Sequence, residues 1–147
     1  MMADVIFDVD GTLMDIDHRR HHVEQRPKDF KAFREDMIYD TPNKDVVMMA
    51  KLLKEAGHRI IISTGRLEQD KDLTLKQLKD AGVDYDLALF RGMWEEFHSD
   101  DDIKENMLAD MKKLGFNPTM AFDDRDRVVD MWRANGLRVF QVDKGNF

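Results

Sequence analysis

The stretch that most constrains this chain is Val5-Ile6-Phe7-Asp8-Val9-Asp10-Gly11-Thr12, an apolar run that ends in two carboxylates, a glycine and a hydroxyl. Such a run, closed by glycine, is typical of a buried strand that delivers its last residues to a loop. Strands of this continuous apolar kind belong to parallel sheets, which bind ligands at the carboxyl ends of their strands. The sequence therefore predicts an α/β fold with Asp8 and Asp10 at its functional edge.

Asp8 and Asp10 suggest phosphoryl chemistry because of their spacing. Alternation along a strand places them on the same side, where they repel each other unless a cation lies between them. With Mg²⁺ bound, one carboxylate can remain ionised as a nucleophile while the other handles protons. The alternative is that both aspartates only cap a turn, since Asp-Gly is a common turn signal.

Composition limits the classes of protein that this chain can be. We expect its 147 residues, 1–147, to form one domain with a single core. The absence of cysteine excludes disulfides, a thiol nucleophile and a cysteine-ligated metal. No signal-peptide pattern precedes the first strand, and no apolar run approaches the ~18 residues of a membrane span. We therefore expect a cytoplasmic protein without a membrane partner.

The formal net charge of −7 argues against a broad surface that grips the phosphates of duplex nucleic acid. A single terminal phosphate needs only a few basic contacts, and a bound metal would partly cancel the charge of the site carboxylates. Charge therefore limits the contact area and leaves the substrate class open.

Residues 13–45 separate the first strand from the next helix, and this segment is too long for an ordinary connection in a compact α/β unit. Phe30 and Phe33 follow Pro27 at helical spacing, which predicts a helix over 27–38. We interpret the segment as a small helical cap over the site. An insertion with a purely structural role is the alternative.

The cap carries a cluster of histidines and arginines at residues 18–22. The histidines lack the fixed helix or strand that a metal site needs. The arginines are better candidates, since a guanidinium matches a phosphate in a bidentate manner.

The next apolar run, residues 59–66, predicts a second buried strand, preceded by a helix over 44–56. Four residues at its end suit the oxygens of a phosphate: Ser63, Thr64, Gly65 and Arg66. Hydroxyls and backbone amides at a strand end can hold such oxygens. A strand terminus with an N-capping hydroxyl is the alternative.

The alternation of helix and strand continues to the end of the sequence. The pattern predicts helices over 70–80 and 102–114, and strands over 87–90, 118–125 and 138–142. Lys104 lies at the start of a helix, where the helix dipole disfavours a cation; it is either an ordinary exposed lysine or one that reaches the site. Asp123 and Asp124 are adjacent carboxylates, which are costly unless a cation lies between them or Asp124 caps a helix.

Together these motifs resemble the haloacid dehalogenase (HAD) superfamily over nearly the whole chain. D-x-D-G-T at 8–12, S-T-G-R at 63–66, a lysine that opens a helix and F-D-D-R at 122–125 follow the order of that superfamily. The D-D-R-D-R-V-V-D-M-W-R run at 123–133 and the final Q-V-D-K-G-N-F more specifically resemble the 3′-phosphatase domain of bacteriophage polynucleotide kinase. The resemblance implies a HAD-like Rossmannoid fold: a mainly parallel five-stranded sheet, helices on both faces and a small cap after strand 1.

The same resemblance implies a role for each motif residue. Asp8 would form an aspartyl-phosphate, Asp10 would act as general acid and base, and Lys104 would bridge the phosphate to Asp8. The implied phosphate ligands are Arg19, Ser63, Thr64, Gly65 and Arg66. The implied Mg²⁺ ligands are Asp8, Asp10 through its backbone carbonyl, Asp123 and Asp124.

The function implied in this way is a Mg²⁺-dependent phosphomonoesterase, with a polynucleotide 3′-phosphatase as the first interpretation and a nucleic-acid 3′ end or nucleotide as substrate. A free-nucleotide phosphatase and a phosphate-binding module without turnover are the alternatives, although intact Asp8 and Asp10 argue against the second. No G-x-x-x-x-G-K-[ST] loop occurs, so no kinase domain is expected in this chain. The sequence leaves open the oligomeric state and the choice between water and another hydroxyl as acceptor.

Overall fold

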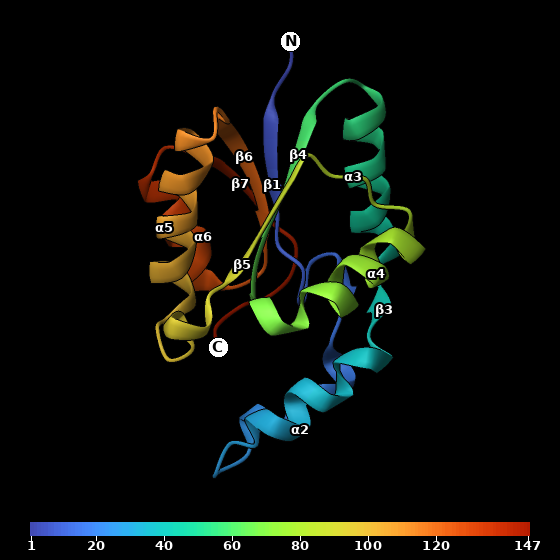
Figure 1. Ribbon diagram of the computed structural model, residues 1–147, viewed down its shortest axis with the longest axis vertical. Coiled ribbons are helices and arrows are strands. Elements are labelled where there is room, and N and C mark those ends of the chain that lie inside the picture. The colour runs from blue at the N-terminus through green and yellow to red at the C-terminus, as the bar shows by residue number, and fades with distance from the viewer.

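The computed structural model describes residues 1–147, and a five-stranded sheet forms its centre (Figure 1). The strands are β1 (Asp4–Phe7), β4 (Arg59–Leu67), β5 (Leu87–Arg91), β6 (Pro118–Asp123) and β7 (Arg138–Gln141). Their order is β5-β4-β1-β6-β7, and every neighbouring pair is parallel. All four residues of β1 are buried, as a central strand covered on both faces requires. The predicted parallel α/β sheet is confirmed.

Two long helices cover each face of the sheet (Figure 1). One face carries α3 (Lys44–Glu55) and α4 (Lys71–Ala81), and the other carries α5 (Asp100–Lys113) and α6 (Asp126–Ala134). The side chains of β1 alternate between the two faces of the sheet, so β1 contributes to the core on both sides. Phe7 packs in the same core cluster as Val47 of α3. Its neighbour Ile6 belongs to the opposite cluster, with Met107 and Trp132. None of these helices combines the length and the apolar character that a bilayer crossing demands.

The predicted cap is a separate helical extension at the lower end of the sheet (Figure 1). Its stem is a two-stranded antiparallel ribbon of β2 (Met14–Asp15) and β3 (Thr41–Pro42). Four short helical segments lie between these strands: η1 (Asp17–Arg19), α1 (His21–Glu24), α2 (Phe30–Glu35) and η2 (Asp36–Tyr39). The cap therefore leaves and rejoins the body at nearly the same place.

The helix predicted over 27–38 was wrong in its bounds. Helix α2 begins only at Phe30, because the Asp29 side chain accepts the backbone N–H of Ala32 at 3.0 Å and caps the first turn. The chain then tightens into η2. Pro27 lies before the helix, so its fixed φ does not start the first turn.

The segment after β5 also differs in detail from the prediction. It contains a short 3₁₀ helix, η4 (Met93–Glu95), and α5 starts at Asp100, two residues earlier than predicted. Lys104 therefore lies in the second turn of α5, where it is buried. Leu114, the last residue of the predicted helix, is the exposed C-cap residue of α5.

Candidate active site

Acidic and basic side chains meet at the carboxyl-terminal edge of the sheet. Asp8 follows β1 directly, and its backbone N–H donates to the carbonyl of Phe122 in β6 at 3.0 Å. Asp123 is the last residue of β6, so the parallel register of β1 and β6 brings Asp8 and Asp123 together. Lys104 reaches both from α5.

Asp8, Asp123 and Asp124 form a buried carboxylate cluster. One carboxylate oxygen from each residue lies within 4.8 Å of the others. The residues are 5%, 1% and 2% exposed. Lys104 Nζ donates to Asp8 Oδ1 at 2.9 Å and to Asp123 Oδ2 at 3.0 Å. One buried ammonium therefore pairs with two of the three carboxylates, and Arg20 Nη2 lies 3.5 Å from Oδ2 of the third, Asp124.

Burial and repulsion perturb the pKa values in this cluster. Burial, followed by the charge of Asp123, raises the pKa of Asp8 well above its usual range. The same two causes raise the pKa of Asp124 to about 6. Burial opposes the ammonium of Lys104, but the charges of Asp123 and Asp8 outweigh burial and raise its pKa. The cluster carries an excess of negative charge that a bound cation would neutralise.

Neighbouring residues fix the orientation of these carboxylates. Thr12 Oγ1 donates to Asp8 Oδ2 at 3.0 Å, and Trp132 Nε1 donates to Asp123 Oδ2 at 3.2 Å. Gly11 has a φ of +79°, and a Cβ at this position would collide with the Asp124 carboxylate. Only glycine combines that backbone conformation with so close an approach.

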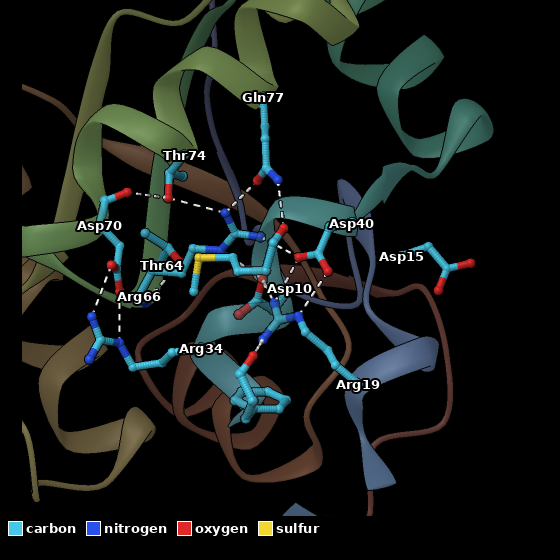
Figure 2. A network of polar contacts seen from close by, with 12 residues as sticks. Asp10, Asp15, Arg19, Arg34, Asp40, Thr64, Arg66, Asp70, Thr74 and Gln77 are labelled. Carbon is cyan, nitrogen blue, oxygen red and sulfur yellow. Dashed lines mark hydrogen bonds and ion pairs between the residues drawn. The ribbon is translucent and has the colours of Figure 1, made fainter. Parts of the chain in front are cut away.

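Asp10 belongs to a second network, shared with Arg19, Arg66 and Asp40 (Figure 2). Asp10 Oδ1 accepts from Arg19 Nη2 at 3.0 Å and from Arg66 Nε at 2.8 Å. Asp40 Oδ2 accepts from the same two guanidiniums, at 2.8 and 2.7 Å. Burial pushes the pKa of Asp10 upward, but the charges of Arg66 and Arg19 outweigh burial and hold that pKa below its usual range. Among the four predicted Mg²⁺ ligands, Asp10 alone has its side chain outside the carboxylate cluster.

Sequence reasoning missed Asp40. Its side chain is fully buried, and its Oδ1 also accepts from Arg19 Nε at 2.8 Å and lies 2.7 Å from His18 Nε2. Asp40 stands where the cap returns to the body, directly before β3. The only signal in the sequence was the excess of arginine in the cap, since buried guanidiniums require carboxylate partners.

Further polar contacts attach the cap to α4 and the residues before it (Figure 2). Arg34 donates to both carboxylate oxygens of Asp70 at 3.0 Å. Gln77 Nε2 donates to the Met37 carbonyl at 2.8 Å, and Gln77 Oε1 accepts from Arg66 Nη1 at 2.6 Å. The cap is therefore held against the body by oriented hydrogen bonds.

The residues of the S-T-G-R motif have different environments. The Ser63 hydroxyl donates to Met107 Sδ at 3.3 Å, inside the layer formed by α5. Thr64 Oγ1 accepts the backbone N–H of Arg66 at 3.1 Å. The Gly65 carbonyl accepts from Arg91 Nε at 2.9 Å, a contact that sequence reasoning also missed. The motif brings Thr64 and Arg66 to the Asp10 network, while Ser63 packs under α5.

Solved structures of low sequence identity share this fold. A putative β-phosphoglucomutase from Thermotoga maritima matches with a TM-score of 0.69 and 16% identity, over 95% of this chain and 85% of that chain. The haloacid dehalogenase-like hydrolase SP0104 from Streptococcus pneumoniae matches with a TM-score of 0.65 and 12% identity, over 95% and 84%. The fold is that of the HAD-like hydrolases, as the sequence predicted.

Two further structures are more similar in sequence. A chain of the "Pnkp1/Rnl/Hen1 complex" matches with a TM-score of 0.80 and 29% identity, over 99% of this chain and 47% of that chain. A chain of the "Pnkp1/Rnl/Hen1 RNA repair complex" matches with 0.78 and 30%, over 99% and 44%. The present chain thus spans less than half the length of these relatives.

Fold and family together define the class of this protein as a phosphoric monoester hydrolase of the HAD type. The family described as "Polynucleotide kinase PNKP phosphatase domain" matches residues 2–147. The chain belongs to that family.

Proposed function

We propose that this chain is a Mg²⁺-dependent polynucleotide 3′-phosphatase that works through an aspartyl-phosphate on Asp8. The observation that carries the proposal is the buried cluster of Asp8, Asp123, Asp124 and Lys104, in a chain of the PNKP phosphatase-domain family. We further propose that residues 1–147 act as one catalytic unit, with 13–45 as its cap.

The residues of the carboxylate cluster fit a divalent cation. Lys104 pairs with two of the three buried carboxylates and Arg20 lies against the third, so the cluster keeps an excess of negative charge when all three are ionised. Hard cations such as Mg²⁺ prefer oxygen ligands of this kind. Asp8, Asp123 and Asp124 would hold the ion, and the bound ion would stabilise negative charge on the phosphoryl group.

The chain's own residues can perform both steps of the reaction. In the first step a carboxylate oxygen of Asp8 attacks phosphorus and the ester P–O bond breaks. Asp10, which would be protonated once the substrate phosphate has taken over its hydrogen bonds from Arg19 and Arg66, gives that proton to the leaving 3′ oxygen. In the second step Asp10 takes a proton from water, the water oxygen bonds to phosphorus, and the bond to Asp8 breaks, which releases phosphate and restores both aspartates. Lys104 keeps Asp8 oriented and balances its charge.

The present hydrogen bonds of Arg66 and Arg19 bear on how each could bind the substrate phosphate. Arg66 contacts Asp10, and Arg66 and the backbone of Thr64 and Gly65, which precede it in β4, suit the non-bridging oxygens. Arg19 has no exposed surface, and its donors are engaged by Asp10, Asp40 and the Phe33 carbonyl. We propose that the substrate phosphate takes over hydrogen bonds that Arg19 and Arg66 now give to Asp10, which frees Asp10 for proton transfer.

A substrate panel tests this function. Phosphate release is measured with Mg²⁺ from oligonucleotides phosphorylated at the 3′ or the 5′ end, from 3′- and 5′-mononucleotides and from a sugar phosphate. The 3′-phosphorylated oligonucleotide should give the highest kcat/KM, and EDTA should abolish its turnover. Equal or faster hydrolysis of 5′-mononucleotides or sugar phosphates would overturn the assignment of substrate.

The covalent step has its own test. In a single turnover stopped with acid, mass spectrometry of the parent protein should find one phosphoryl group on the peptide that contains Asp8. The matched control is Asp8→Asn, which removes the nucleophile at constant size. A phosphorylated peptide elsewhere in the chain would refute the role of Asp8.

A further inference from the structure

The segment between β5 and α5, residues 92–99, exposes apolar side chains beside the active site. We call it the aromatic loop. Met93, Trp94 and Phe97 are 50%, 76% and 94% exposed. In Figure 1 this segment lies at the lower end of the sheet, where the cap also lies. Exposed apolar side chains that lie together on a surface are candidates for a binding site.

The base of the aromatic loop is rigid and is attached to the phosphate-binding motif. Arg91 is buried, and it donates through Nε to the Gly65 carbonyl at 2.9 Å and through Nη1 to the Glu95 carbonyl at 2.8 Å. The Glu95 carboxylate turns back and accepts the backbone N–H of Gly92 at 3.0 Å. The loop is therefore fixed relative to Gly65, which precedes Arg66.

The Trp94 ring is also held in place. It packs edge-on against His98, with the ring centroids 5.9 Å apart at an interplanar angle of 90°. A Cβ at Gly92 would come within 2.8 Å of the indole Nε1, so Gly92 leaves room for the ring. A ring fixed in this way loses little conformational freedom when a planar group stacks on it.

The surrounding charges favour a base over a phosphate at this loop. Glu96 is close enough to the cap residue Arg34 that its charge helps, after the hydrogen bonds that Arg34 donates to Asp70, to raise the pKa of that arginine. The aromatic loop therefore lies near α2 of the cap. Arg91, the cation that directly precedes the loop, is buried and engaged with carbonyls and with Asp100. The accessible part of the loop thus offers rings and the Glu96 carboxylate, which suit the face of a nucleobase and repel its phosphates.

Resting on the proposed function, we propose that Trp94, with Phe97, stacks on a nucleobase of the single strand adjoining the 3′-terminal nucleotide, and thereby gives longer substrates their advantage. Aromatic rings stack on any base, so the preference would be for length and not for sequence.

The test is a length series of single-stranded substrates with a 3′ phosphate, from a mononucleotide to a tetranucleotide. The measured quantity is the ratio of kcat/KM between the longest and the shortest substrate. One stacked base should give the parent a ratio of roughly 5- to 100-fold. Trp94→Ala should reduce the ratio to near one, and Trp94→Phe should restore most of it. Trp94→Leu, which keeps apolar surface but no ring, should resemble Trp94→Ala.

Leu52→Ala is the matched control, because Leu52 is also exposed and apolar but lies on α3. It should keep the ratio of the parent, and unchanged thermal melting should confirm the fold of every variant. The difference in the kcat/KM ratio between the parent and Trp94→Ala should persist at high salt, because stacking does not depend on counterion release. The proposal would be overturned if Trp94→Ala left the kcat/KM ratio unchanged. The same holds if sedimentation showed a dimer that depends on Trp94 while the ratio stayed the same.

A binding experiment separates this proposal from the proposed function. An Asp8→Asn protein is titrated into a fluorescent single-stranded oligonucleotide with a 3′ phosphate, and anisotropy is recorded with and without the Trp94→Ala change. If the Trp94→Ala change weakens binding of the oligonucleotide but the parent protein releases no phosphate from 3′ ends, the 3′-phosphatase activity is refuted and the stacking site stands. Turnover of 3′ phosphates together with Trp94-independent binding would refute the stacking site alone.

Discussion

Asp40→Asn should destabilise the fold strongly, although the change alters only one atom of the side chain. Asp40 is fully buried and accepts hydrogen bonds from two buried guanidiniums, those of Arg19 and Arg66. With asparagine, Asp10 becomes the sole carboxylate facing both charges. Removing one partner of a buried pair costs about 3–5 kcal/mol, since the remaining charge is not compensated.

For a chain of 147 residues this loss corresponds to a decrease in melting temperature of roughly 10–15 °C. Urea unfolding should show a lower midpoint with an unchanged slope. The matched control is Asp36→Asn, because the Asp36 side chain is 37% exposed and pairs only with His22. That control should lose less than ~1 kcal/mol.

A second measurement tests the cause of the loss. The two guanidiniums freed in Asp40→Asn should bind sulfate or phosphate, so these anions should raise the melting temperature of the variant more than that of the parent. Stability of Asp40→Asn within ~0.5 kcal/mol of the parent, the range of ordinary surface substitutions, would refute the view that Asp40 holds the two arginines in place.

Three further predictions follow from the site and the core. Asp8→Asn should reduce kcat by at least ~10³-fold while the protein still melts cooperatively, and turnover near that of the parent would contradict the assigned nucleophile. Millimolar Mg²⁺ should raise the melting temperature of the parent but not of Asp124→Ala, and equal shifts in both proteins would place the ion elsewhere. The bidentate hydrogen bonds from Arg59 lower the pKa of Asp4 in the folded protein, so Asp4 stabilises the fold above the unfolded pKa of about 4 and loses that effect as the pH falls further. Unfolding followed from pH 6 to pH 2 should therefore show a weaker acid dependence in Asp4→Asn, and identical profiles would exclude this pair as a source of acid sensitivity.

The parts of the fold that could be predicted from the sequence are those set by local pattern. Continuous apolar runs predicted the strands, and the helix predicted over 70–80 is observed as α4, which ends at Gly82 with a φ of +81°. Because parallel strands end at one edge of the sheet, the residues after each run could be expected to converge there. The pairing of Asp8 with Lys104 and Asp123 agrees with that expectation.

Details of the cap depended on the tertiary structure. Its helices are short, and contacts with residues distant in sequence, such as those of Arg34 with Asp70, hold them where intrinsic helix propensity is weak. The position of Lys104 illustrates the same effect in the body. Lys104 is buried in the second turn of α5, and its charge is compensated by two carboxylates that are distant in sequence.

The sequence by itself determined which chemical groups stand at the strand ends, and therefore the class of chemistry that this edge can support. The tertiary structure alone decided which of these groups meet. Asp40 joins Arg19 and Arg66 across 21 and 26 positions of the chain, and the Asp10 side chain pairs with the same two arginines. Local patterns carry no information about such pairs, because a buried charge is stabilised by whichever opposite charge the packing of cap and sheet brings within hydrogen-bonding distance.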